Sequence, residues 1–388
     1  MLQYPDPLRD YPLSWVKSLA GIKEKNDVIR LEKKDIRGLV KDPDLQQFYS
    51  RIEELSRLGQ LPELPPMEED RYTFLYTIPK KQHEIRKLGP FVHHVAKNSG
   101  TKKIIDIGGG IGKLAQTLNS QYNLHMISVD MDPVLQDTGK RRQEKKGKPA
   151  PNEVEYVTAK VDEADLTFQG LLDENTMTLG LHTCGALANH QIMTSSRHSV
   201  RSIINFGCCY HKLEHEMNGQ NISTFAQNHS DKIVLGHFSL ALSARAHRKM
   251  DSKDYDLKQK VKYFRYAIHM LLHDFYGEKE LVTLGNSNPA LYDEDFGTYA
   301  LEQLKRTPHQ SIHTREELNA WFNDKARQEL LWDMIASGLI RNSFGRLLEL
   351  YLLLDRAIYL EEQGYLVNLQ EFFIEEISPR NIGLIATR

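Results

Sequence analysis

A glycine-rich turn between a short apolar segment and a helical pattern constrains this fold more than any other feature. The segment 103–107 reads Lys-Ile-Ile-Asp-Ile and is followed by four glycines, Gly108, Gly109, Gly110 and Gly112. Glycine has no Cβ atom, so the backbone of the turn can approach a ligand closely. A helical pattern begins near Lys113, and the free N–H groups at its start favour an anionic ligand. A tight strand-to-helix turn without a ligand also uses glycines, so the pattern G-x-G-x-G alone leaves both alternatives open.

Short apolar segments alternate with helix-length segments after this turn. Further strands are predicted at 124–130, 154–158, 177–182 and 202–206. This alternation is typical of βαβ units and predicts an α/β fold with a doubly wound, mostly parallel, Rossmann-like sheet. Two later strand-like segments predict a C-terminal β-hairpin on the same sheet, at 366–374 and 381–387.

Helical patterns on both sides of these strands predict four parts. Residues 1–76 are expected to form an N-terminal helical extension, and residues 77–211 the Rossmann-like core. Residues 212–345 are mostly helical and are predicted to form an insertion or lid. Residues 346–388 are expected to complete the core with a helix and the hairpin. No internal repeat is visible, so a solenoid is not expected.

Composition narrows the class of protein and its location. The chain has 388 residues, of which 40% are hydrophobic and 26% charged, and its net charge is −2. No apolar run is long enough to span a membrane, and the opening residues lack the pattern of a signal peptide, so we expect a cytoplasmic protein without membrane association. The near-neutral charge restricts any nucleic-acid binding to a local patch.

An acid at the end of the second predicted strand helps to identify the ligand. Asp130 follows Asp106 by 24 residues, close to the offset of roughly 20 residues at which a carboxylate accepts the ribose hydroxyls. An adenosine-containing cofactor is therefore expected, and NAD would also satisfy this spacing. Asp106 favours S-adenosylmethionine, because a carboxylate suits its ammonium group and would repel a pyrophosphate. Asp106 could instead cap the turn through the backbone.

The predicted cofactor site combines three segments. The turn and the following strand ends contribute Asp106, Gly108, Gly110, Gly112, Lys113, Asp130, Met131 and Asp162. A helix predicted at 79–97 begins with polar residues that could meet the cofactor carboxylate or a substrate phosphate, namely Lys80, Lys81, His83 and Glu84. The alternative for this last segment is an exposed helix start.

Two later strand ends carry candidate catalytic side chains. In a parallel sheet, ligands bind beyond the carboxyl ends of the strands, where 180–185 and 205–211 would lie. His182 could accept a proton from a hydroxyl or amine, and we also predict that it contacts the cofactor; its alternative role is to shape the turn. A thiolate at Cys184 or Cys209 could attack a pyrimidine, or these cysteines could pack as small buried side chains. Tyr210 completes the predicted catalytic set.

The three cysteines are expected to be free thiols, because they are too few for a disulfide framework. Zinc is an alternative for a set of side chains that could converge, namely Cys184, Cys208, Cys209, His211 and His215. Adjacent cysteines are not a usual chelating spacing, so no metal is predicted.

One basic cluster is a candidate RNA contact. It consists of Lys140, Arg141, Arg142, Lys145, Lys146 and Lys148. Such a cluster is either a phosphate-binding patch or a solvated helix end and loop, and the sequence does not decide between them.

These motifs together resemble the methyltransferase-like protein 25 group, which includes ribosomal RNA adenine dimethylase domain-containing protein 1. The resemblance depends on the ordered motifs at 80–84, 106–113, 180–185, 206–210, 353–356 and 378–381. It implies a class I methyltransferase that uses S-adenosylmethionine, with the helical insertion as part of the family's fold.

The resemblance also bears on the methyl acceptor. A more distant similarity to tRNA 2′-O-methyltransferases of the acceptor stem implies RNA as the substrate. Residues 208–211 read Cys-Cys-Tyr-His, where those enzymes have two histidines after the cysteines, so their chemistry does not transfer directly. No N-P-P-Y or D-P-P-Y motif for amine methylation follows the fourth strand. The alternatives are a methyltransferase for a protein side chain or metabolite, and a non-catalytic protein that binds S-adenosylmethionine.

Overall fold

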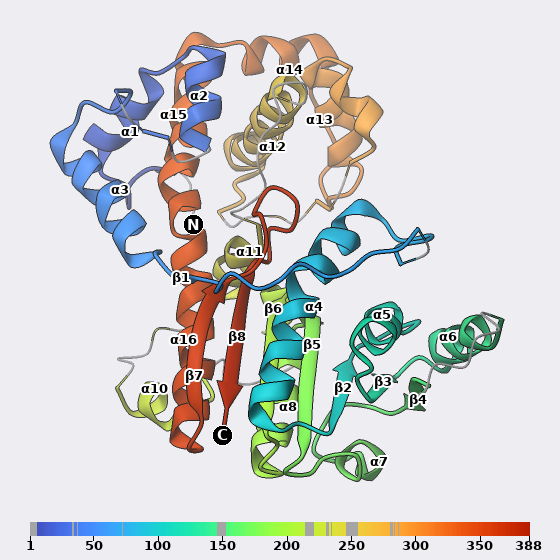
Figure 1. The fold of residues 1–388 in the computed structure, drawn as a ribbon. Helices are drawn as coiled ribbons and strands as arrows, with labels where there is room; N and C mark the ends of the chain where they lie inside the picture. The colour runs from blue at the N-terminus through green and yellow to red at the C-terminus, as the bar shows by residue number, and fades with distance from the viewer. Residues whose placement is uncertain are drawn as a thin grey trace. The chain divides into compact units, whose positions relative to one another are not determined.

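The computed structural model divides into two compact units (Figure 1). The first contains residues 1–55 and 248–344, and the second contains residues 56–247 and 345–388. The structure describes residues 6–32, 35–36, 38–71, 73–145, 153–213, 221–229, 233, 235–245, 255–279, 282, 284–285 and 287–388.

The second unit is built on a mixed sheet in the order β1-β7-β8-β6-β5-β2-β3-β4. Its strands are β1 (Gly59–Gln60), β2 (Lys103–Ile107), β3 (Met126–Asp130), β4 (Glu155–Thr158), β5 (Thr176–Cys184), β6 (Ser202–Cys208), β7 (Leu366–Glu371) and β8 (Ile382–Thr387). Strands β2 to β6 pair in parallel, whereas β8 runs antiparallel to both β6 and β7. The predicted mostly parallel sheet with a C-terminal hairpin is thereby confirmed.

Helices cover both faces of this sheet. They are α4 (Pro79–Ser99), α5 (Lys113–Tyr122), α6 (Pro133–Lys145), α7 (Leu166–Gln169), α8 (Leu187–Arg197), α10 (Thr224–His229), α11 (His237–Arg245) and α16 (Gly345–Glu362), with a short 3-10 helix η1 (Tyr210–Lys212). Successive strand residues point to opposite faces. Ile104 accordingly packs in a cluster with Leu88 of α4, and Ile105 in a second cluster with Ile192 of α8 and Leu360 of α16. The sheet is therefore doubly wound, as predicted.

The strand order reverses at β2. The chain runs from β2 outward to β3 and β4, and then returns to β5 on the other side of β2. Ligands of open α/β sheets bind beyond the carboxyl ends of the strands at such a switch point. The fold therefore places the glycine-rich turn, which follows β2, where a cofactor is expected.

The first unit is helical and combines two distant segments of the chain. Its helices are α1 (Leu13–Ala20), α2 (Lys25–Glu32), α3 (Pro43–Leu55), α12 (Tyr255–Tyr276), α13 (Phe296–Leu304), α14 (Arg315–Phe322) and α15 (Lys325–Ser343), with the 3-10 helix η3 (Pro289–Tyr292). Lys17 pairs with Asp333, and Trp332 Nε1 donates a hydrogen bond to Ala20 O at 2.7 Å. No helix in the described part of the chain is long and apolar enough to cross a bilayer.

This division differs from the predicted boundaries of 1–76 and 212–345. One apolar cluster contains Leu19 and Leu45 together with Ile268 and Met334. Short amphipathic helices gain most of their stability by burying an apolar stripe against other elements. The N-terminal helices thus share a core with residues 248–344, a pairing that separate periodic patterns do not reveal.

Candidate active site

The glycine-rich turn adopts a conformation that requires glycine at several positions. Gly108, Gly110 and Gly112 have φ values of +66°, +59° and +71°, in the left-handed region that residues with a Cβ atom rarely adopt. Gly109 is constrained by space instead, because a Cβ atom there would lie 2.4 Å from Ser128 Oγ of β3. The turn therefore requires glycine at positions 108, 110 and 112 for its backbone conformation and at position 109 for space.

Asp130 lies directly beside this turn. Its Oδ2 accepts a hydrogen bond from the Gly110 N–H at 2.9 Å, and its Oδ1 accepts one from the Asp132 N–H at 3.0 Å. An ionised carboxylate can accept about four hydrogen bonds, so each oxygen retains acceptor capacity. The carboxylate is thus held by the turn and can still accept a pair of hydroxyl groups.

Apolar side chains are exposed next to Asp130. Met131 is 71% exposed and Val134 is 66% exposed, both near the start of α6. Asp162 lies in the loop after the neighbouring strand β4, where its Oδ1 accepts the N–H of Ala164 at 2.9 Å. The hydrogen bond from Lys160 lowers the pKa of Asp162. Met131 and Asp162 therefore follow adjacent strands at the same edge of the sheet, and their contact with a cofactor stays a prediction.

Asp106 lies beneath the turn. It is 2% exposed, and burial raises its pKa to about 7, although the charge of Lys81 and a hydrogen bond from the Ala115 N–H act in the opposite direction. The Ala115 contact matches the alternative that Asp106 caps the turn. Within the described residues, Asp106 Oδ2 has no hydrogen-bond partner. One buried acceptor thus remains that an ammonium group could satisfy.

Glu84 of α4 forms hydrogen bonds with the end of β5 and with the loop between β7 and β8. Its Oε1 lies 2.7 Å from His182 Nε2, and the Ser378 hydroxyl donates to the same oxygen at 2.7 Å. Burial opposes ionisation of Glu84, but the hydrogen bonds from His182 and Ser378 and the charge of Lys80 outweigh it and lower the pKa to about 2. Glu84 is therefore ionised across the neutral range and holds the imidazole in place.

His182 has an unusual backbone. Its φ is +65°, and the pairing of β5 with β6 shifts register between Leu181 and Thr183. A left-handed residue with a Cβ atom costs roughly 1–2 kcal/mol, and such strain clusters at functional sites. The side chain keeps 24% exposure, so the imidazole is positioned by Glu84 without being fully enclosed.

Lys113 and His83 make contacts away from the turn. Lys113 Nζ donates to Thr73 O at 3.1 Å, and the Ile374 N–H donates to His83 Nε2 at 3.1 Å. His83 therefore anchors the loop between β7 and β8. For both residues, the predicted cofactor contact stays a prediction.

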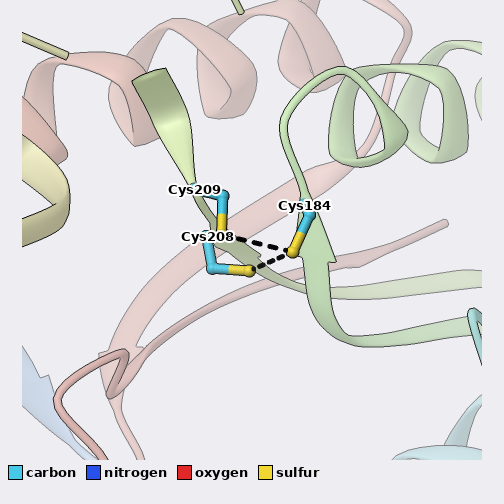
Figure 2. A group of neighbouring side chains, drawn as sticks. All are labelled: Cys184, Cys208 and Cys209. Carbon is cyan, nitrogen blue, oxygen red and sulfur yellow. Dashed lines mark hydrogen bonds between the residues drawn. The ribbon is translucent and has the colours of Figure 1, made fainter. Parts of the chain in front are cut away.

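The three thiols lie together at the ends of β5 and β6 (Figure 2). Cys184 Sγ is 3.0 Å from Cys208 Sγ and 3.4 Å from Cys209 Sγ. The hydrogen bond with Cys208 lowers the pKa of Cys184 to about 6, and the hydrogen bond with Cys184 together with burial raises the pKa of Cys208. Cys184 is therefore the thiol most readily ionised.

Tyr210 is enclosed in the core. It is 1% exposed, and its hydroxyl donates to Gly207 O at 3.3 Å. Burial also raises its pKa. Its predicted catalytic role is corrected here, because a phenol enclosed in the core packs the end of β6 and does not reach a substrate.

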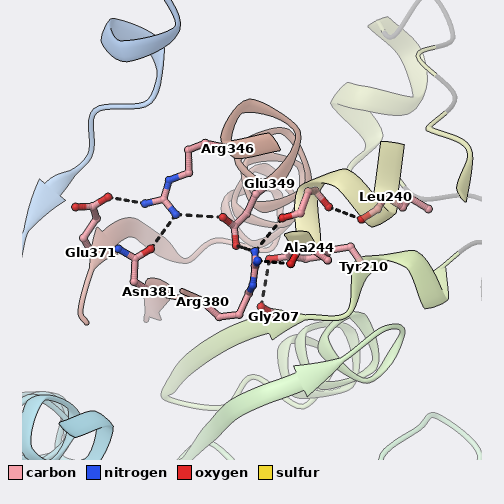
Figure 3. A network of polar contacts seen from close by, with 10 residues as sticks. Gly207, Tyr210, Leu240, Ala244, Arg346, Glu349, Glu371, Arg380 and Asn381 are labelled. Carbon is pink, nitrogen blue, oxygen red and sulfur yellow. Dashed lines mark hydrogen bonds and ion pairs between the residues drawn. The ribbon is translucent and has the colours of Figure 1, made fainter. Parts of the chain in front are cut away.

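A buried polar network supports the loop that carries Ser378 (Figure 3). Arg346 donates to Glu349 at 3.1 Å and to Asn381 at 2.8 Å, and Arg380 donates to the other oxygen of Glu349 at 3.1 Å. Arg380 also donates to backbone carbonyls at the end of α11, including Ala244 O. The motif at 378–381 contributed to the family resemblance, but the sequence predicted no structural role for it. Its role is to fix this loop against α16 and α11.

The basic cluster lies partly on α6. Lys140, Arg141, Arg142 and Lys145 are exposed, whereas Lys146 and Lys148 lie outside the described residues. The helix begins three residues after Asp130, at the edge of the sheet that carries the turn.

Residues 80–216 match the family model described as a methyltransferase domain. The chain carries a methyltransferase domain. This match includes the glycine-rich turn, Asp130, His182 and the three cysteines, and it implies S-adenosylmethionine as the cofactor. The strand order with its antiparallel β8 is that of the predicted class I fold.

Curated relatives agree with the predicted family resemblance. The chain is 24% identical over 232 residues to the probable methyltransferase-like protein 25 of Mus musculus, a match that covers 55% of this chain and 38% of the relative. For the Homo sapiens protein of the same name, identity is 23% over 229 residues, covering 55% and 37%. The match therefore spans less than two-fifths of the length of these relatives.

Solved methyltransferase structures are more distant. One is the magnesium protoporphyrin IX methyltransferase from Synechocystis, at a TM-score of 0.24 and 14% identity, covering 47% of this chain and 71% of that one.

Proposed function

We propose that this chain transfers the methyl group of S-adenosylmethionine to RNA. The observation that carries the cofactor half of this proposal is the contact between Gly110 N–H and Asp130, which joins the turn after β2 to the carboxylate that ends β3. The turn would hold the methionine portion, and Asp130 would accept the ribose hydroxyls. The cofactor supplies an electrophilic methyl group, and the chain must position the acceptor and remove its proton.

His182 is the proposed general base. Because Glu84 is ionised and accepts a hydrogen bond from Nε2, the neutral imidazole carries its proton on Nε2. This tautomer leaves Nδ1 able to accept a proton from a hydroxyl or amine of the substrate. Glu84 and Ser378 act as positioning residues, since they contact the imidazole or its partner.

RNA is proposed as the acceptor because of the charge on α6. Lys140, Arg142 and Lys145 are exposed, and the helix starts beside the cofactor residues Asp130 and Met131. A basic face adjacent to the reaction site suits a phosphate backbone. A cytoplasmic location forms part of the proposal and is supported by three thiols that are free in the structure.

The test is methyl transfer from labelled S-adenosylmethionine to a cell extract that lacks the endogenous protein. RNase digestion should release the label, whereas protease digestion should leave it in the RNA fraction. Label that is released only by protease would identify a protein as the methyl acceptor. Label that is found only in small molecules would identify a metabolite. His182→Ala should abolish transfer even at saturating concentrations of S-adenosylmethionine. Full activity of this variant would remove His182 from the mechanism, and no transfer by the wild-type chain to any fraction would support a non-catalytic binding protein.

A further inference from the structure

Three cysteines from two strand ends converge on one point. Cys184 ends β5, Cys208 ends β6, and Cys209 follows directly, so that the three Sγ atoms all lie within 4.8 Å of one another (Figure 2). Thiolates are preferred ligands of zinc and of other soft cations. We propose that Cys184, Cys208 and Cys209 form a zinc site at the carboxyl edge of the sheet.

The backbone explains how adjacent cysteines can share one metal. Neighbouring residues of an extended strand point to opposite faces, so adjacent cysteines within a strand would not bind the same metal. Cys209 has a φ of +52°, in the left-handed region, so the strand alternation ends at this residue. The side chains of Cys208 and Cys209 therefore both turn toward Cys184.

The distances between the Sγ atoms are close to those of thiolates bound to one zinc ion. Zinc–sulfur bonds of about 2.3 Å place tetrahedral thiolates roughly 3.8 Å apart. The Cys184 Sγ atom lies 3.0 Å from Cys208 Sγ and 3.4 Å from Cys209 Sγ. These two separations would have to grow by less than about 1 Å on binding.

A buried cation lies beside the residue that follows Cys209. Arg356 of α16 is 2% exposed, and its Nε donates to the neutral side chain of Asn189 at 2.7 Å. Among the described residues, its Nη1 has no hydrogen-bond partner. The guanidinium carbon lies 5.4 Å from the centre of the Tyr210 ring, and Tyr210 directly follows Cys209. Zinc with three thiolates carries a charge of −1, and Arg356 supplies the opposite charge.

The site adjoins the proposed catalytic histidine. Cys208 Sγ lies 3.4 Å from His182 O, so a metal would fix the irregular end of β5. Three protein ligands leave a fourth position on zinc, and Cys184 and Cys209 are both partly exposed. Water or another donor from outside the three cysteines would complete the coordination. Metal binding is measured without S-adenosylmethionine, so its failure is distinguishable from failure of the proposed methyl transfer.

The chain has three cysteines in all, so thiol signals report on this site alone. The fully reduced, chelator-treated chain should take up one zinc ion that survives gel filtration, with release of protons from the thiols. Ellman's reagent should detect three reactive thiols without zinc and none with it. Cobalt should give thiolate-to-metal charge-transfer absorption. Unchanged thiol reactivity in the presence of zinc, or cobalt spectra without that absorption, would overturn the proposal.

Serine variants test which cysteines bind the zinc ion. Cys184→Ser, Cys208→Ser and Cys209→Ser should each lose the zinc retained after gel filtration. The control His125→Gln changes an exposed histidine that pairs with Glu155 and should keep it. Full retention by any one serine variant would contradict the three-thiolate site. If a serine variant fails to fold, the proposal is still tested in the wild-type chain by whether zinc protects the thiols from Ellman's reagent.

Discussion

His182 Nε2 lies 2.7 Å from Glu84 Oε1, and this contact joins parts of the chain that are 98 residues apart. Ser378, which is 294 residues from Glu84 in the sequence, donates to the same carboxylate oxygen. The motifs at 80–84, 180–185 and 378–381 thus form one hydrogen-bonded unit. Its buried carboxylate controls the orientation of the imidazole.

Glu84→Gln should weaken the fold in a way that depends on pH. The pKa of Glu84 is about 2 in the folded chain, against about 4.3 for an unfolded glutamate. A lowered pKa contributes stability above the unfolded value, and this stability is lost as the pH falls toward the folded value. We expect the variant to lose about 3 kcal/mol of unfolding free energy at pH 7, and the difference to shrink between about pH 4.3 and pH 2. Urea unfolding followed by circular dichroism measures both.

The exposed Glu361 provides the control for this experiment. Glu361→Gln should leave the free energy of unfolding within about 0.5 kcal/mol of wild type at every pH. A loss in Glu84→Gln that is the same at pH 7 and pH 2.5 would contradict a role for the ionised carboxylate.

Gly112→Ala should destabilise the chain more than Gly100→Ala. Both glycines have a φ of +71°, so both variants incur the same backbone strain. A Cβ atom at position 112 would lie 2.7 Å from the Tyr156 ring, whereas nothing lies within 4 Å of one at position 100. We expect a cost of about 1 kcal/mol for Gly100→Ala and about 2–4 kcal/mol for Gly112→Ala. Equal thermal melting temperatures for the two variants would show that the turn is not packed as described.

Arg346→Met should cost more than Arg51→Met, although both arginines pair with a glutamate three residues later. The Arg346–Glu349 pair is 6% and 2% exposed, whereas Arg51–Glu54 is 61% and 62% exposed. Breaking a buried pair typically costs about 3–5 kcal/mol and an exposed one about 0–1 kcal/mol. Chemical unfolding measures the difference, and similar costs for the two variants would mean that the network in Figure 3 does not stabilise the loop.

Replacing Lys140, Arg142 and Lys145 with glutamine should weaken RNA binding for all sequences alike. If each side chain contacts one phosphate of single-stranded RNA, the slope of log K against log salt should fall by about 2. Binding is measured by fluorescence anisotropy at several salt concentrations. A matched triple variant of Lys23, Lys41 and Lys325, all exposed on the helical unit, should keep both affinity and slope. Unchanged binding by the α6 variant would remove this helix from the RNA interface.

Local patterns predicted much of the fold. The strand Lys103–Ile107, the helix start at Pro79 and the C-terminal hairpin were expected, because each depends on periodicity, proline or turn chemistry within a few residues. The shared core of residues 1–55 and 248–344 was not expected, since it depends on contacts between distant segments. A periodic stripe shows that a helix face is buried but does not identify its partner.

The candidate site was also predicted only in part. The turn and Asp130 follow from spacing along one βαβ unit, and the structure brings them into contact. The pairing of Glu84 with His182, and the enclosure of Tyr210, depend on how α4 and α16 pack and were not predicted. The convergence of the cysteines depends on a left-handed backbone at Cys209, which no sequence pattern signals.

Calorimetric titration with S-adenosylmethionine and its demethylated product tests the central claim most directly. The folded wild-type chain should bind one equivalent of each. Asp130→Asn keeps one carbonyl acceptor but removes the charge, and it should bind about 10- to 100-fold more weakly, as expected for loss of a charge-assisted hydrogen bond worth about 1.5–3 kcal/mol. Absence of binding by the folded wild-type chain, or equal affinity in Asp130→Asn, would contradict an adenosyl group held between the glycine-rich turn and Asp130.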